Sequence, residues 1–126
     1  MTPDQEKPAV AIVDDDPRLL ESLGEMFESA GYEAHTFASA SALLLRGLAG
    51  IDALITDIGM PQVSGFDLRD LVCETHPDLP VFLITGRHEI ADLVRASGAT
   101  GFLRKPFDPQ ALLEAVSGAV ERQVKQ

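Results

Sequence analysis

Five short runs of β-branched and aliphatic residues recur along this chain and constrain its fold more than any other feature. The runs are separated by segments of eight or more residues in which apolar side chains return every three or four positions. Regular alternation of strand and helix patterns is typical of a parallel sheet covered on both faces. The expected strands span 9–13, 32–37, 52–56, 80–84 and 101–104.

The intervening segments have the spacing of amphipathic helices. Two dipeptides, Asp16-Pro17 and Asp108-Pro109, each have the form of a helix N-cap followed by proline at the first helical position. We therefore predict an α/β fold: a five-stranded parallel sheet of order 2-1-3-4-5 in a flavodoxin-like three-layer sandwich. Helices are expected to begin at residues 17 and 109 and to span 40–48, 65–75 and 90–97.

Composition narrows the class of protein. The 126 residues, 45% hydrophobic, suit one globular domain. A net charge of -10 argues against binding to the phosphate backbone of a nucleic acid. No apolar stretch approaches the ~18 residues of a membrane span, and the polar start does not resemble a secretory signal. The lone Cys73 excludes a disulfide within the chain, and we expect it half-buried in a helix. These features favour a cytoplasmic protein.

Polar residues follow or end four of the expected strands. Asp14 and Asp15 follow the first strand, Asp57 follows the third, Thr85 the fourth and Lys105 the fifth. Ligands of open α/β sheets bind outside the carboxyl ends of the strands, where the strand order reverses. In the order 2-1-3-4-5 the first and third strands are neighbours, so the aspartates are expected to converge. Together the polar strand ends predict a binding site.

The residue types at this site favour phosphoryl transfer. Three carboxylates in one crevice repel one another, and Mg²⁺, which prefers oxygen ligands, would offset their charge. With Asp14 and Asp15 holding the cation, a carboxylate oxygen of Asp57 could attack phosphorus and form an aspartyl-phosphate. Lys105 and Thr85 would supply a positive charge and a hydroxyl donor to the phosphoryl oxygens. No glycine-rich phosphate loop follows the first strand, so nucleotide binding is not expected.

The motifs in which these residues stand resemble the receiver domain of two-component response regulators. They are Asp14-Asp15, "TDIGMP" followed by "SGFDL", Thr85-Gly86 and "KPF" at 105–107. The combination is most similar to the branch that contains the nitrogen-fixation regulators, whose receivers precede a helix-turn-helix output. The resemblance covers residues 8–122, which leaves 1–7 and 123–126 as flexible termini.

Carried over by motif, the resemblance implies a role for each site residue. Asp57 is the phosphoacceptor, and its phosphoryl group comes from the histidine of a sensor kinase. Mg²⁺ is held by Asp14, Asp15 and Asp57, with the backbone carbonyl of Gly59 as a further ligand. Such a domain catalyses its own phosphorylation and dephosphorylation and is not a turnover enzyme. A large side chain often stands at the position of Gly59, so this chain departs from the family there.

The resemblance also implies a switch. Thr85 and Lys105 contact the phosphoryl group, and Phe102 takes the place of the family's switch aromatic. Movement of the Thr85 hydroxyl toward the phosphoryl group would let Phe102 rotate inward. We expect this to alter the face made by the fourth helix, fifth strand and fifth helix, and to promote a homodimer or partner binding there. The interval from Thr85 to Lys105 is short for the family, by roughly half a helical turn.

Two alternative functions stay open at this point. A haloacid-dehalogenase-like phosphatase carries D-x-D after its first strand, which Asp14-x-Asp16 matches, and its nucleophile would be Asp14. Pro17 and Arg18 do not continue that pattern. The second alternative is a receiver-like module that binds proteins without being phosphorylated, although each reactive residue is present. The site of the acyl-phosphate distinguishes these functions: Asp57, Asp14 or neither.

Overall fold

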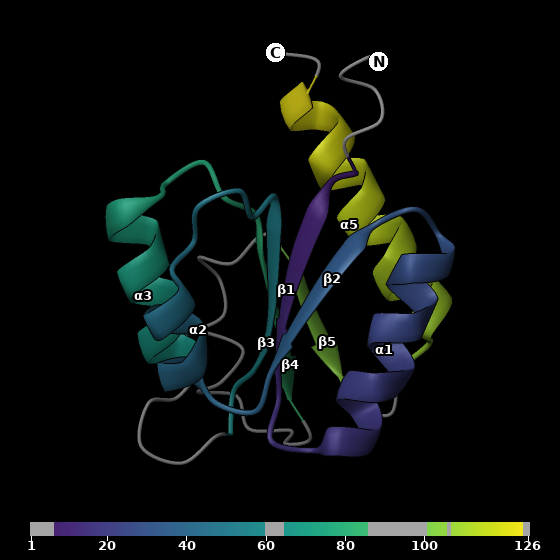
Figure 1. Ribbon diagram of the computed structural model, residues 1–126, viewed down its shortest axis with the longest axis horizontal. Helices are drawn as coiled ribbons and strands as arrows, with labels where there is room; N and C mark the ends of the chain where they lie inside the picture. The colour runs from purple at the N-terminus through teal and green to yellow at the C-terminus, as the bar shows by residue number, and fades with distance from the viewer. Residues whose placement is uncertain (1–6, 60–64, 86–100, 106, 125–126) are drawn as a thin grey trace.

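The computed structural model describes residues 7–59, 65–85, 101–105 and 107–124 (Figure 1). The strands are β1 (Ala9–Val13), β2 (Glu33–Phe37), β3 (Ala53–Asp57), β4 (Val81–Thr85) and β5 (Gly101–Arg104). The helices are α1 (Pro17–Ser29), α2 (Ala40–Arg46), α3 (Gly65–Thr75) and α5 (Pro109–Val124). The expected helix over 90–97 and the domain boundaries near residues 7 and 123 stay predictions, since 90–97 and most of the terminal residues lie outside the described ranges.

The strands form one parallel sheet in the predicted order, β2-β1-β3-β4-β5. Figure 1 shows α2 and α3 on one face of this sheet and α1 and α5 on the other, so the three-layer arrangement is confirmed. The strand order reverses at β1, which has β2 on one side and β3 on the other. The carboxyl ends of β1 and β3 therefore lie side by side.

Both faces of the sheet are buried, and each strand divides its side chains between two cores. In β1, Ala9, Ala11 and Val13 face the α2 and α3 layer, whereas Val10 and Ile12 face the α1 and α5 layer. All five side chains are buried, which explains why the strand reads as an unbroken apolar run. Burial of one such aliphatic side chain stabilises the fold by about 1.5–3 kcal/mol.

Two helix starts share one capping geometry. The carboxylate of Asp16 accepts a hydrogen bond from the backbone N–H of Arg18 at 3.0 Å, and Pro17 opens α1. The carboxylate of Asp108 accepts one from the backbone N–H of Gln110 at 3.0 Å, ahead of α5. The predicted capping role of Asp16 is thus confirmed, and the second Asp-Pro dipeptide repeats it.

The amino ends of the central strands are held by another aspartate. Oδ2 of Asp52, the residue before β3, accepts the backbone N–H of Ala9 at 2.7 Å. The backbone N–H of Asp52 donates in turn to the carbonyl oxygen of Ala9 at 2.8 Å. This pair of bonds fixes where β1 begins relative to β3.

The ring of Phe82 lies against Gly101, the first residue of the edge strand β5. A Cβ atom at Gly101 would lie 2.5 Å from a ring carbon of Phe82, its partner in β4. The ring of Phe82 belongs to the core under α1 and α5, so it occupies the space that a side chain at position 101 would need. Any other residue at position 101 would force the ring of Phe82 to shift, which favours glycine at this point of the edge strand.

One expectation about the surface is wrong. Cys73 is exposed on α3, not half-buried, because the buried positions Leu68 and Val72 of that helix leave it on the solvent side. Among the described residues, no helix is both long enough and apolar enough to span a bilayer.

Candidate functional site

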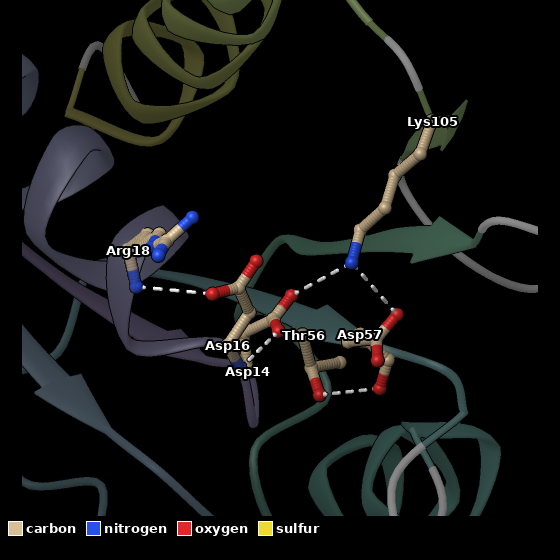
Figure 2. A network of polar contacts seen from close by, with 6 residues as sticks. All are labelled: Asp14, Asp16, Arg18, Thr56, Asp57 and Lys105. Atoms are coloured by element: carbon tan, nitrogen blue, oxygen red, sulfur yellow. Dashed lines mark hydrogen bonds and ion pairs between the residues drawn. The ribbon is translucent and has the colours of Figure 1, made fainter.

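The structure brings most of the predicted site residues to one edge of the sheet. We use the term carboxyl edge for Asp14, Asp15, Asp57, Thr85 and Lys105, which lie at or just after the ends of β1, β3, β4 and β5. Figure 2 shows Asp14, Asp57 and Lys105 pointing toward one another from three different strands. The convergence expected from the strand order is thus observed.

Asp14 is the most enclosed acid of the carboxyl edge. Its side chain is 2% exposed. Oδ1 accepts the backbone N–H of Asp16 at 2.8 Å, and Oδ2 accepts a hydrogen bond from Nζ of Lys105 at 3.3 Å. Its own backbone N–H donates to the carbonyl oxygen of Phe37 at 3.1 Å, which extends the pairing of β1 with β2 past the strand end. Asp14 therefore has fixed partners for the backbone and for both carboxylate oxygens.

Asp57 ends β3 as a buried carboxylate among like charges. Burial raises the pKa of its carboxyl group, and the neighbouring charges of Asp14 and Asp15 raise it further. Lys105, whose Nζ lies 3.7 Å from Oδ1 of Asp57, opposes the rise in pKa, as does a backbone hydrogen bond from Gly59. The net shift is upward, so the protein holds this negative charge in an environment that disfavours it.

Lys105 is the cation that contacts both carboxylates. Burial lowers its pKa, but the charges of Asp57 and Asp14 outweigh burial, and the net pKa is raised. The ammonium group is therefore held in its charged form between Oδ2 of Asp14 and Oδ1 of Asp57. Among the residues that the structure describes, the one positive charge of Lys105 does not balance Asp14, Asp15 and Asp57, so this set keeps an excess of negative charge.

The same three aspartates satisfy the donor requirements of a divalent cation. Asp14, Asp15 and Asp57 each offer a carboxylate oxygen, and these atoms all lie within 4.8 Å of one another. Asp15 is exposed, so the site has access to solvent. An all-oxygen donor set that leaves room for water suits Mg²⁺, which keeps several waters when bound to proteins. The residues present therefore fit the predicted metal.

Gly59 leaves open space beside this donor set. A Cβ atom built at Gly59 would meet no heavy atom of the described residues within 4 Å. The residue is exposed and follows Asp57 by two positions. The described part of the chain therefore leaves room for a Cβ at this position, two residues after Asp57.

Thr85 and Phe102 lie on adjacent strands. Thr85 is 2% exposed at the end of β4, and its carbonyl oxygen accepts the backbone N–H of Lys105 at 2.6 Å. Phe102 pairs with Leu83 and packs on the core under α2 and α3, whereas Leu103 packs on the opposite core. Successive side chains of β5 thus lie on opposite faces of the sheet. Phe102 is already partly buried, so any inward rotation would add less apolar burial than rotation from full exposure.

Sequence reasoning missed Thr56, which precedes Asp57 in β3. Thr56 is fully buried, and its hydroxyl donates to the carbonyl oxygen of Asp57 at 3.1 Å (Figure 2). A buried hydroxyl is costly unless it is hydrogen-bonded, and this bond ties the side chain to the backbone of the candidate nucleophile. The available signal was a polar residue inside the otherwise apolar run "ALIT".

Comparison with protein families and known proteins gives one consistent result. Residues 10–117 match the family model described as the response regulator receiver domain. The chain is 37% identical over 122 residues to nodulation protein W of Bradyrhizobium diazoefficiens, covering 94% of this chain and 54% of that protein. It is 37% identical over 120 residues to the transcriptional regulatory protein GlrR of Escherichia coli K12, covering 92% of this chain and 27% of that protein.

The chain thus spans about half of the first relative and about a quarter of the second. Among solved structures, a CheY-like response regulator receiver domain protein from Methanospirillum hungatei JF-1 aligns with a TM-score of 0.88 and 27% identity. The alignment covers 95% of this chain and 98% of that one. The relatives include a nodulation protein and a transcriptional regulator, which agrees with the predicted branch.

Proposed function

Because the chain belongs to the response regulator receiver domain family, we propose that it accepts a phosphoryl group on Asp57 from a histidine of a sensor kinase. One observation carries this proposal. The carboxylate of Asp57 lies at the carboxyl edge with Lys105 at 3.7 Å and with the donor oxygens of Asp14 and Asp15 within 4.8 Å of its own. A nucleophile, a cation and a set of metal ligands therefore meet at one point.

The transfer is a displacement at phosphorus. An Oδ atom of Asp57 forms the new P–O bond as the P–N bond to the donor histidine breaks, and the bonding electron pair leaves with the imidazole. Charge on the equatorial oxygens is the main electrostatic demand of such a transition state. Nζ of Lys105 lies near enough to Asp57 to meet part of that demand. Thr85, at the end of the neighbouring strand, supplies a hydroxyl donor.

Asp14 and Asp15, with Asp57 and the backbone carbonyl of Gly59, would hold Mg²⁺. When bound, the cation supplies positive charge that offsets the carboxylates and the phosphoryl oxygens. The protein's own contribution is to hold Asp14 rigidly, through the N–H of Asp16 on one oxygen and Lys105 on the other. Catalysis of phosphorylation and dephosphorylation is then a property of the domain itself, which remains a signalling component and not a turnover enzyme.

The contacts of Asp14 argue against the phosphatase alternative. Hydrogen bonds to both oxygens of Asp14 fix the orientation of a carboxylate that we assign to Mg²⁺ binding and not to attack on phosphorus. Its side chain is 2% exposed, whereas that of Asp57 is 10% exposed. Asp57 is therefore the better placed nucleophile. Reaction at Asp57 also distinguishes the proposal from a receiver-like module that is not phosphorylated.

Phosphorylation would be read out through Thr85 and Phe102. The two residues lie on adjacent strands. Phe102 packs on the same core as Leu83, which lies two positions before Thr85 in β4. The proposed output face includes β5 and α5, with Arg104 and Glu114 exposed on them. Its remaining element, over 90–97, lies outside the described residues. We propose that this face forms a homodimer or binds a partner protein after phosphorylation. The domain would act in the cytoplasm and would not itself bind nucleic acid.

The decisive experiment locates the phosphoryl group. The chain is incubated with Mg²⁺ and a small acyl phosphate, the product is reduced with borohydride, and the modified peptide is identified by mass spectrometry. We expect modification at Asp57, its loss in Asp57→Asn, and its suppression by a chelator. Modification at Asp14 would support the phosphatase alternative, and absence of any modified aspartate would support the unphosphorylated module.

A further inference from the structure

Thr56 is a buried polar residue at a position that is surrounded by apolar ones. Its partners in the neighbouring strands are Val13 of β1 and Leu83 of β4, and both belong to the core under α2 and α3. Leu54 and Ile58, two positions before and after Thr56 in the chain, belong to the same core. Valine would fill the same volume without burying a hydroxyl, so core packing gives no reason for threonine at this position.

The hydroxyl of Thr56 is bonded to the backbone that follows it. Oγ1 donates to the carbonyl oxygen of Asp57 at 3.1 Å (Figure 2). The N–H of the same peptide group, which belongs to Ile58, donates to the carbonyl oxygen of Ile84 at 2.8 Å. The peptide group that joins Asp57 to Ile58 is therefore held at both of its polar ends, at one by β4 and at the other by the side chain of Thr56.

This peptide group lies where the chain leaves the sheet at the carboxyl edge. Asp57 is the last residue of β3, and a backbone hydrogen bond from Gly59 reaches back to its carboxyl group. Because a peptide group is planar, its rotation would move the backbone that follows, including the N–H of Gly59. A hydroxyl that fixes the peptide group after Asp57 therefore also fixes a donor to the Asp57 carboxylate.

We propose that Thr56 is a positioning residue for phosphorylation: its hydroxyl holds the peptide group after Asp57, and thereby the backbone of Gly59, around the Asp57 carboxylate. The inference rests on the proposed function and deepens it, since it names a side chain outside the carboxyl edge that prepares the nucleophile. Thr56 is fully buried, so it acts through the backbone of its neighbour and not by contact with the donor.

The test separates the hydroxyl from the rest of the side chain. Thr56→Val keeps the shape and removes the hydrogen-bond donor, whereas Thr56→Ser keeps the donor and removes the methyl group. Val81→Ala is the control, because it weakens the same core at the amino end of β4, away from the carboxyl edge. Labelling of Asp57 is followed over a range of concentrations of a small acyl phosphate, at a temperature at which urea unfolding shows every variant to be folded.

We expect Thr56→Val to lower the maximal labelling rate about three- to tenfold, the effect of one neutral hydrogen bond, with the half-saturating donor concentration unchanged. Thr56→Ser and Val81→Ala should label at the wild-type rate, although both lose apolar contacts in the core. A purely structural role of Thr56 would instead lower the stability of the variants and leave the labelling rate of the folded protein unchanged.

Calorimetry with Mg²⁺ in the absence of donor gives a second measurement that does not depend on labelling. The carbonyl of Gly59 is a proposed metal ligand, so Thr56→Val should bind Mg²⁺ more weakly than Thr56→Ser and the wild-type chain.

Three results would overturn the inference while the wild-type chain is still labelled at Asp57. They are a wild-type labelling rate or Mg²⁺ affinity in Thr56→Val, an equal loss in Thr56→Ser or Val81→Ala, and an effect confined to the half-saturating donor concentration. Absence of label at Asp57 in the wild-type chain would overturn the proposed function and this inference with it.

Discussion

Two aspartates bracket β3, and they occupy opposite electrostatic environments. Asp52, just before the strand, directs Oδ2 at the backbone N–H of Ala9 at 2.7 Å. Asp57, at the end of the strand, faces the charges of Asp14 and Asp15, and burial together with those charges raises its pKa. An aspartate thus accepts a stabilising hydrogen bond at one edge of the sheet, whereas at the other edge an aspartate is repelled by the negative charges of its neighbours.

This difference separates the stabilising edge of the fold from the reactive edge. At the amino edge the carboxylate satisfies a backbone donor that burial would otherwise leave without a partner. At the carboxyl edge the carboxylates are brought together although Lys105 cannot balance their charge. A folded protein keeps such an arrangement when a ligand completes it, because positions with strongly perturbed pKa values concentrate at functional sites.

The largest expected difference between the two aspartates is in phosphorylation. Asp57→Asn removes the attacking oxyanion and keeps the shape of the side chain, so we expect labelling by an acyl phosphate to fall by more than about a hundredfold. Asp52→Asn keeps an oxygen acceptor for Ala9 and should be labelled like the wild-type chain. Intact-mass spectrometry over a time course measures both rates. Retained labelling in Asp57→Asn would show that Asp57 is not the phosphorylated residue, and the carboxyl edge could then no longer be called the reactive edge on the strength of Asp57.

The next largest effect is stabilisation by Mg²⁺. A ligand that binds only the folded protein stabilises it by about 2.7 kcal/mol at a hundred times its dissociation constant. Asp15→Asn should reduce this gain strongly, since Asp15 is exposed and contributes a donor oxygen to the cluster. Asp16→Asn should retain it, because asparagine caps helices about as well as aspartate. Thermal unfolding across a Mg²⁺ titration compares the two variants. An equal loss of Mg²⁺ stabilisation in both would contradict the assignment of Asp15 as a metal ligand and of Asp16 as a helix cap.

A smaller effect is expected at the amino edge. Asp52→Ala leaves the N–H of Ala9, a residue 4% exposed, without its side-chain acceptor. We expect a loss of about 1–3 kcal/mol in the free energy of unfolding, with no change in Mg²⁺ affinity. Asp78→Ala, which removes an exposed aspartate, is the control. Urea unfolding measures the loss, and a wild-type midpoint in Asp52→Ala would show that the bond does not stabilise the strand start.

The sheet order and the convergence of the site could be predicted because both follow from local signals. Apolar runs with β-branched residues specified the strands, and polar residues at strand ends specified Asp14, Asp57 and Lys105 once the order placed β1 beside β3. The capping role of Asp16 could be told apart from the metal-binding roles predicted for Asp14 and Asp15, because proline follows Asp16 and marks the start of a helix. These inferences depend on short stretches of chain and on one topological rule.

Contacts between residues far apart in sequence could not be predicted in the same way. Nothing in the sequence around Asp52 indicates that its acceptor faces Ala9, 43 positions away. The steric need for Gly101 depends on the ring of Phe82 in the neighbouring strand. Cys73 was placed wrongly because helical spacing alone did not show which side of α3 meets the sheet. Such features depend on register and side-chain packing, which no local pattern encodes.

The most direct test of the central claim is the free energy of unfolding of Asp57→Asn. The pKa of Asp57 is raised in the folded chain, so the unfolded chain loses this proton at lower pH, and the charge destabilises the fold at neutral pH. At pH 7 without Mg²⁺, urea unfolding should show Asp57→Asn to be more stable than wild type, on the order of 1 kcal/mol. The gain should shrink as the pH falls toward 4, and saturating Mg²⁺ should reverse its sign. A less stable Asp57→Asn at pH 7 without Mg²⁺ would contradict the claim that the carboxyl edge holds its charge at the expense of stability.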